Sequence, residues 1–145
     1  MVFGLFALTA AALFAGAAFY VSFVEHPARL LLDDRSQLAQ WKPAYARGAQ
    51  MQASLALIGF ALGLVAWWQT RDLRWLAGAI VLIAAWPYTL LIIKPVNDAL
   101  KATASEAVGP RSRARLMRWG HLHLGRTALG VGSAAFYLWA AAGRT

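Results

Sequence analysis

One apolar stretch of the sequence carries a histidine and an arginine at a spacing that suits acid–base chemistry. His123 lies four residues after Trp119, and Arg126 lies three residues further on. On a helix, steps of about 100° per residue keep these three side chains within a narrow arc. An imidazole ordinarily titrates near neutrality, so His123 would serve as a general base, while the guanidinium of Arg126 would stabilise a developing oxyanion. His121 points about 200° away from His123, so we expect His123 to be the functional histidine.

Other polar and aromatic residues stand at the ends of neighbouring apolar stretches. Glu25 closes the first stretch and Asn97 follows the third, where its amide would bind a carbonyl or a peroxide. A charge as deep as Arg126 needs a partner, and Glu25 is the preferred one, with Asp98 second. The aromatic residues that would enclose a flat ligand are Trp41, Tyr45, Trp86, Tyr88 and Trp119.

A metal or haem site is an alternative interpretation of the same cluster. Glu25, His26, His121 and His123 offer oxygen and nitrogen donors that suit imidazole-binding metals. The pair His121 and His123 is a poor chelate on a regular helix, because the two rings point in different directions. A metal site would therefore require a locally unwound segment there.

Four apolar runs must position these residues. The first, residues 2–24, carries no charge over more than the roughly 20 residues that a helix needs to cross a membrane. Because a backbone in lipid must satisfy its own hydrogen bonds, all four runs should be helical. We expect an all-α, transmembrane, antiparallel four-helix bundle in a single domain, residues 1–145. The expected helices are 2–26, 42–68, 73–93 and 117–142.

Two prolines refine these helices. Pro43 is tolerated in a first helical turn, which predicts a start of the second helix near Lys42. Pro87 lacks an N–H and crowds the carbonyl of Ile83, which predicts a bend in the third helix.

The distribution of positive charge predicts an orientation. Of the fourteen Lys and Arg residues, ten lie in the connections after the first and third runs, and only Arg71, Arg74 and Arg144 lie on the opposite side. Short basic loops stay in the cytoplasm, so both termini should be non-cytoplasmic, in an inner membrane of bacterial type. The basic run 111–118 should meet anionic lipid headgroups rather than nucleic acid. The absence of Cys excludes disulfides and thiol redox chemistry.

Short motifs in all four runs resemble those of the anthrone-oxygenase-like family of small four-helix membrane proteins. These motifs are Glu25-His26-Pro27, the Trp41, Tyr45 and Arg47 entry to the second run, Pro95-x-Asn97-x-x-Leu100, and Trp119-x-x-x-His123-x-x-Arg126. The resemblance implies a four-helix bundle and, for some members, oxidation of an anthrone to an anthraquinone with O2 and no added cofactor. Within Glu25-His26-Pro27, His26 itself does not match the family pattern, and His121 does not match it either.

This chemistry predicts roles for the clustered residues. An anthrone has a benzylic C–H made acidic by a ring carbonyl, and its enolate can pass an electron to O2 unaided. His123 would be the base, with Arg126, Asn97 and Glu25 as further catalytic residues, and a lipophilic polycyclic or quinol-like substrate would enter from the bilayer. The alternatives are a metal or haem protein, and a non-catalytic protein that binds or transports a small molecule. Glu25 disfavours transport, since it lies at a helix end rather than mid-membrane. The sequence is also compatible with assembly of the chain into a homo-oligomer.

Overall fold

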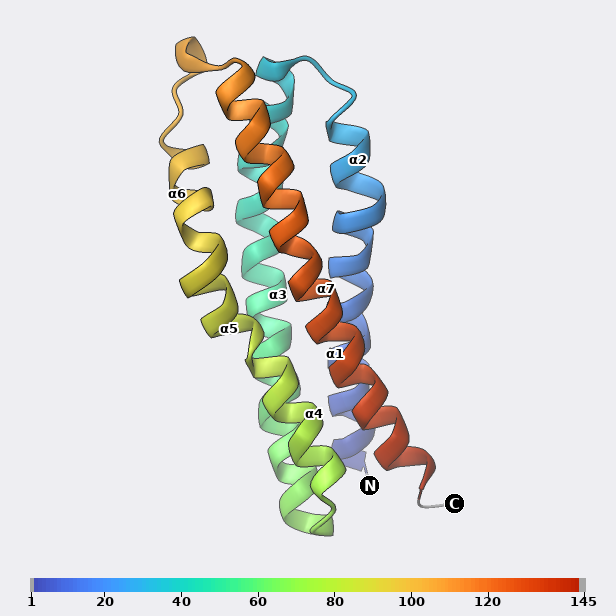
Figure 1. Cartoon of the computed structure of the whole chain (residues 1–145). Coiled ribbons are helices and arrows are strands. Elements are labelled where there is room, and N and C mark those ends of the chain that lie inside the picture. The colour runs from blue at the N-terminus through green and yellow to red at the C-terminus, as the bar shows by residue number, and fades with distance from the viewer. Residues whose placement is uncertain (1, 144–145) are drawn as a thin grey trace.

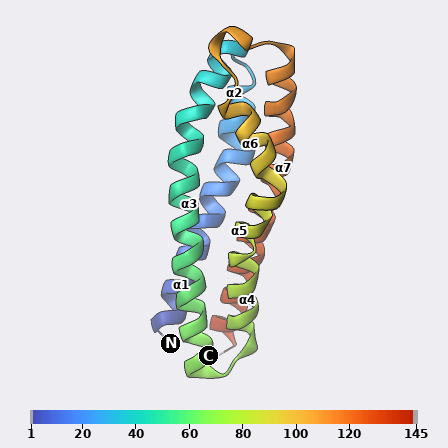
Figure 2. The same ribbon diagram turned by 90° about the vertical axis from the view of Figure 1, so that its left-hand side faces the viewer.

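The computed structural model describes residues 2–143, and within this part of the chain the regular elements are all helical, without strands. The helices join into four rods, shown in Figures 1 and 2. The first rod comprises α1 (Val2–Tyr20), the π-helical turn η1 (Val21–Glu25) and α2 (His26–Arg29). The second is α3 (Asp34–Thr70). The third comprises α4 (Leu73–Ile83), α5 (Ala85–Tyr88), the π-helical turn η2 (Thr89–Ile93) and α6 (Lys94–Lys101). The fourth is α7 (Pro110–Ala142), preceded by the 3-10 turn η3 (Ser105–Ala107).

The rods lie side by side, and their connections fall at two ends. Figure 1 places the two chain termini and the short connection between α3 and α4 at one end, which we call the terminal end. The connections from α2 to α3 and from α6 to α7 lie at the other, the loop end. In the half towards the terminal end, α1 packs against α3 and α7, and α4 packs against the same two helices. Because every rod runs from one end to the other, residues from all four rods lie near one another towards the loop end.

Two helices begin earlier than the sequence predicted. α3 begins at Asp34 rather than near Lys42, because the Asp33 carboxylate caps it by accepting the backbone N–H groups of Arg35 and Ser36 at 3.1 and 3.0 Å. Pro43 therefore lies inside α3. α7 begins at Pro110 rather than 117, since proline fits a first helical position whose N–H needs no partner.

The other two rods extend further towards the loop end than expected. The first continues past residue 26 to Arg29, which pairs with Glu25 one turn earlier. The third continues past Ile93 to Lys101, where Asp98 pairs with a lysine on either side. The bend predicted from Pro87 is present, because α4 ends at Ile83 and α5 starts only after a turn at Ala84.

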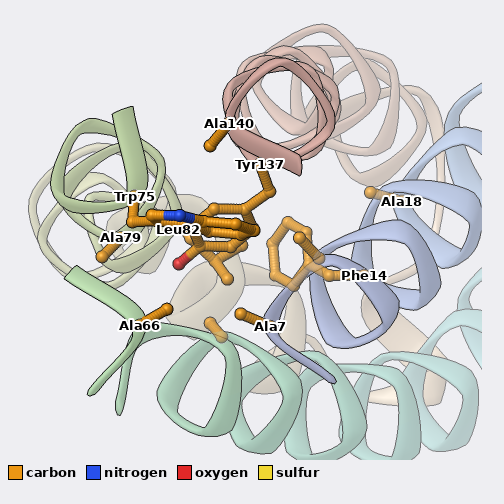
Figure 3. Close-up of a cluster of buried hydrophobic side chains, with 12 residues drawn as sticks. Ala7, Phe14, Ala18, Ala66, Trp75, Ala79, Leu82, Tyr137 and Ala140 are labelled. Atoms are coloured by element: carbon orange, nitrogen blue, oxygen red, sulfur yellow. The ribbon is translucent and has the colours of Figure 1, made fainter. Parts of the chain in front are cut away.

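The core divides into two clusters of buried side chains. The cluster towards the terminal end is mostly alanine around a few large side chains, and Figure 3 shows Tyr137, Trp75 and Phe14 grouped there. Tyr137 fits because Gly63 and Gly78 face it, and a Cβ at either position would come within 2.6 Å of its ring or hydroxyl. The second cluster lies towards the loop end and includes Trp41, Trp119, Leu100 and Leu116.

Three of the rods are long and apolar enough to cross a membrane, namely Val2–Arg29, Asp34–Thr70 and Leu73–Lys101. The fourth, α7, has 33 residues and is long enough, but it contains the polar residues that the sequence singled out. His123, Arg126 and Thr127 are buried between the rods, so their polarity is not presented to the surroundings.

Candidate functional site

A pocket of about 450 Å³, counted to its open mouth, lies among the four rods. Its lining comes from every rod: Val21, Glu25, Arg29, Ala44, Tyr45, Gly48, Ala49, Gln52, Thr89, Ile93, Asn97, Trp119, His123 and Arg126. The pocket therefore brings together most of the residues predicted from sequence, with Trp119, His123 and Arg126 contributed by one face of α7.

Two irregular turns help to form this pocket. The first and last residues of η1, Val21 and Glu25, both line it, as do the first and last residues of η2, Thr89 and Ile93. A π-helical turn holds one residue more than an α-helical turn and widens the helix locally, and such turns are frequent at functional sites. Here each turn presents two residues to the same space.

Arg126 is buried in this pocket without a carboxylate partner among residues 2–143. Its Nε and Nη2 donate to Gln52 Oε1 at 3.3 and 2.9 Å, and its Nη1 donates to Thr89 Oγ1 at 2.5 Å. The side chain also lies over the ring of Phe14, 5.4 Å from its centroid. Only 8% of the residue is exposed. Neutral oxygens solvate the guanidinium but leave its charge uncompensated, which favours an anionic or electron-rich ligand beside it.

The predicted pairing of Arg126 with Glu25 or Asp98 is therefore wrong. Glu25 instead accepts a hydrogen bond from Arg29, one turn later on the same rod. Asp98 is held by Lys94 and Lys101 at 2.5 and 3.1 Å. In both cases a nearby basic residue on the same helix is closer than Arg126, and local i,i+3 and i,i+4 pairs form without bringing rods together.

His123 is buried and anchored on one side of its ring. Its Nδ1 lies 2.9 Å from Ser22 Oγ, and Ser22 Oγ lies 2.9 Å from Thr127 Oγ1. The ring is also 4.9 Å from that of Trp119. Within residues 2–143, Nε2 of His123 makes no hydrogen bond. That nitrogen remains available to a ligand.

Asn97 joins two aromatic residues of the lining. Its Oδ1 accepts the indole N–H of Trp119 at 2.9 Å, and its Nδ2 donates to the hydroxyl of Tyr45 at 3.2 Å. Trp41, fully buried, stacks on Tyr45 with ring centroids 4.8 Å apart and meets Trp119 edge-on at 5.8 Å. Asn97 and Trp41 therefore fix the orientation of the two rings, Tyr45 and Trp119, that face the pocket.

The remaining predicted aromatic residues lie outside this pocket. The hydroxyl of Tyr88 donates to the backbone oxygen of Leu122 at 2.7 Å, in a space that Gly125 leaves open. Trp86 is 41% exposed and donates its indole N–H to Ala53 at 3.3 Å. It lines a second, apolar groove that shares Ala49, Thr89 and Arg126 with the pocket.

The donors of the alternative metal site are not gathered into one group. Among residues 2–143, no set of three or more His, Asp or Glu side chains is placed to hold a metal ion. His121 is exposed beside a different groove, and Glu25 is engaged by Arg29. The His26 ring fits against α7 only because residue 120 is glycine, where a Cβ would lie 2.3 Å from His26 Nε2. The helix around His121 and His123 is regular rather than unwound.

Comparison with known proteins identifies the family. A family model described as anthrone oxygenase matches residues 41–136, which is more than half of the chain. The chain belongs to the anthrone oxygenase family. An anthrone oxygenase of Claviceps purpurea (strain 20.1) is 31% identical over 144 residues, covering 88% of this chain and 82% of that protein. No solved structure matches the chain.

The family resemblance predicted from the motifs is thus confirmed, and the matched segment contains most of the pocket. Residues 41–136 supply the lining from α3, the third rod and α7, including His123 and Arg126. The first rod, which adds Ser22, Glu25 and Arg29 around the pocket, precedes the segment that the anthrone oxygenase model matches.

Sequence reasoning missed several polar residues of the site. Gln52 shares a helical stripe with Trp41 and Tyr45, so its position was a usable signal, yet a neutral amide is an unexpected partner for a buried arginine. Thr89 and Ser22 stand within apolar runs and gave no signal. Their hydroxyls matter only because the rods bring them beside Arg126 and His123.

Proposed function

We propose that this protein is a membrane oxidoreductase that oxidises an anthrone or a similar lipophilic, polycyclic phenol with O2 in the pocket described above. The observation that carries the proposal is the pairing, in one pocket, of an imidazole with a free ring nitrogen and a guanidinium without a carboxylate partner. Family membership supports the reaction class.

The proposed reaction uses the side chains as follows. His123 accepts a proton from the benzylic carbon, and Arg126 stabilises the enolate oxygen that results. Tyr45 and Trp119 pack against the rings. The enolate carbon is oxidised by O2, which adds as a peroxide, and loss of the second C–H proton with cleavage of the O–O bond gives the quinone carbonyl and water. One O2 thus takes up four electrons, one of its atoms becoming the carbonyl oxygen and the other water, which balances the oxidation of CH2 to C=O, so no further oxidant is required.

We propose an antiparallel transmembrane bundle with the pocket at the edge of its apolar surface. On the four rods, the exposed large apolar side chains nearest the loop end are Val24, Met51, Ile92 and Met117. Leu31 and Leu32, in the first connection, are the exceptions. Pocket residues flank this limit, since Gly48 and Gln52 lie on either side of Met51. A site at the boundary between lipid and water would receive a lipophilic substrate and release a more polar product.

The proposed reaction requires no added cofactor, because the substrate itself supplies the electrons. Non-catalytic binding of a lipophilic molecule is the second candidate, favoured by the apolar groove beside Trp86. Oxygen consumption and quinone absorbance in lipid nanodiscs, with an anthrone as substrate, separate the two. Metal analysis and a visible spectrum of the same sample test for a bound group.

The first prediction compares two histidines on α7. His123→Gln should lower the rate of quinone formation by about 10²-fold or more, as expected when a general base is lost, while the matched control His121→Gln should leave it nearly unchanged. Arg126→Leu should also lower kcat, because the enolate loses its counter-charge. Equal losses from the two histidine variants, or quinone formation at the rate of empty nanodiscs, would contradict the proposal.

A further inference from the structure

A chain of hydroxyl groups runs from the imidazole of His123 to the backbone of α1. Ser22 Oγ lies 2.9 Å from His123 Nδ1 and 2.9 Å from Thr127 Oγ1, and Thr127 Oγ1 lies 3.1 Å from the backbone oxygen of Ala18. Three side chains and one carbonyl thus form three consecutive contacts of hydrogen-bond length. His123 and Arg126 face the pocket on the same helix, but neither Ser22 nor Thr127 lines it.

Counting hydrogens fixes the direction of these three bonds. The carbonyl of Ala18 can only accept, so Thr127 donates its single hydroxyl hydrogen to that oxygen. Thr127 Oγ1 must then accept from Ser22, which donates its own single hydroxyl hydrogen in this bond. Ser22 Oγ can therefore only accept from His123. If the imidazole carried its hydrogen on Nε2 instead, one of the three bonds would be lost.

We propose that Ser22 and Thr127 are positioning residues that hold neutral His123 with its hydrogen on Nδ1, leaving the lone pair of Nε2 directed to the ligand. The tautomer follows from the hydrogen bonds alone, whereas the use of Nε2 as the base rests on the proposed function. Ser22 lies in the π-helical turn η1 of the first rod, and Thr127 lies one turn after His123 on α7. The orientation of the base thus depends on contact between two rods.

His26 provides an internal reference with the opposite arrangement. The guanidinium of Arg29 can only donate, so Nδ1 of His26 accepts at 3.1 Å, and a neutral His26 carries its hydrogen on Nε2. His121 is exposed and should exchange between the two forms. The three histidines of the chain should therefore give three distinct signatures.

Nitrogen NMR reads the tautomer without any activity assay. In protein labelled with 15N-histidine and held in lipid nanodiscs, a protonated ring nitrogen and one with a free lone pair have well-separated shifts. His26→Gln and His121→Gln assign the signals. We expect a protonated Nδ1 and an unprotonated Nε2 at His123. A protonated Nε2 with a free Nδ1 would overturn the proposal.

Removing one hydroxyl should reverse the tautomer. In Thr127→Val, Ser22 loses its acceptor and can donate to Nδ1, so the His123 hydrogen should move to Nε2. Thr127→Ser should keep the native tautomer, and Thr9→Val removes a hydroxyl that donates to the backbone oxygen of Leu5 in its own helix at 2.8 Å, so it should leave His123 unaffected. An unchanged tautomer in folded Thr127→Val would refute the chain of donors. Should that variant fail to fold, Ser22→Ala removes the partner of Nδ1 and should give a mixture of both forms.

Kinetics connect this arrangement to the reaction. Thr127→Val should lower kcat for anthrone oxidation by roughly 10-fold or more with KM little changed, and Thr127→Ser should restore it. If the tautomers behave as expected but wild type forms no quinone, the positioning holds and the oxidase function fails. If wild type forms quinone while His123 carries its hydrogen on Nε2, the positioning fails and the oxidase function stands.

Discussion

Trp119 connects the polar and the aromatic halves of the pocket. Its indole N–H donates to Asn97, and its ring lies 4.9 Å from His123, 5.3 Å from His26 and 5.8 Å from Trp41. A buried amide oxygen needs a donor, so Asn97 and Trp119 constrain one another. The rotamer of Trp119 in turn limits where the imidazole of His123 can lie.

Replacing this indole by a phenyl ring should expose the cost of an unpaired amide. Trp119→Phe keeps an aromatic ring but leaves Oδ1 of Asn97 without its donor, which should lower the free energy of unfolding by about 1–3 kcal/mol. Denaturant titration in detergent measures the change. The matched control, Trp68→Phe, alters a residue that is 63% exposed and should have little effect. Equal stability of both variants would show that the hydrogen bond contributes nothing.

The third rod separates the pocket from its surroundings incompletely. Beyond the break at Ala84, α5 and η2 leave an apolar groove against α3, lined by Ala49, Ala53 and Ala56 together with Trp86. Thr89 and Arg126 line both this groove and the pocket. We therefore expect the small side chains on α3 to open a lateral route between the outer surface of the rods and the buried guanidinium.

Narrowing this groove should slow substrate entry without disturbing the chemistry. Ala53→Leu adds bulk to its wall, and we expect KM for a lipophilic anthrone to rise several-fold while kcat changes little. Ala61→Leu adds the same bulk at an exposed position on α3 and serves as the control. An equal KM in the two variants would mean that substrates enter elsewhere. A several-fold fall in kcat of Ala53→Leu with an unchanged KM would mean that the substitution slows the chemical step and not substrate entry.

Helical periodicity was sufficient for part of this arrangement. It placed His123 with Trp119 and Arg126, whereas apolar length predicted the runs as helices and the missing N–H of Pro87 predicted the bend. It could not predict the partner of Arg126, because an amide on another rod contacts it rather than a carboxylate. The early start of α3 depends on the Asp33 cap, a local signal that the apolar pattern does not contain. Contacts between rods, such as that of Ser22 with His123, leave no trace in spacing.

The rods are longer than the hydrocarbon layer of the membrane that they are proposed to cross. α3 has 37 residues and so extends about 55 Å, against a hydrocarbon layer of about 30 Å. The excess falls at the loop end, where ten of the fourteen Lys and Arg residues lie. These basic residues should hold the loop end, and the pocket near it, on the cytoplasmic side.

The orientation is testable because the chain has no native cysteine. Gln69→Cys places a thiol at the terminal end, and Glu106→Cys places one in η3 at the loop end. In intact cells, a membrane-impermeant maleimide should label the Gln69→Cys protein at once and the Glu106→Cys protein only after permeabilisation. The reverse pattern would put the termini in the cytoplasm and the pocket on the outer face.

The number of residues in each of the two π-helical turns determines which face of the following helix points to the site. Each of η1 and η2 holds one residue more than an α-helical turn would, so each acts as a single-residue insertion into the helix that contains it. Loss of one residue from either turn would restore a regular helix but change its phase, rotating everything beyond it by about 100°. α2 or α6 would then present a different face to α7. The helical phase that the two turns set, more than the identity of the residues in them, keeps Glu25 and Asn97 at the pocket.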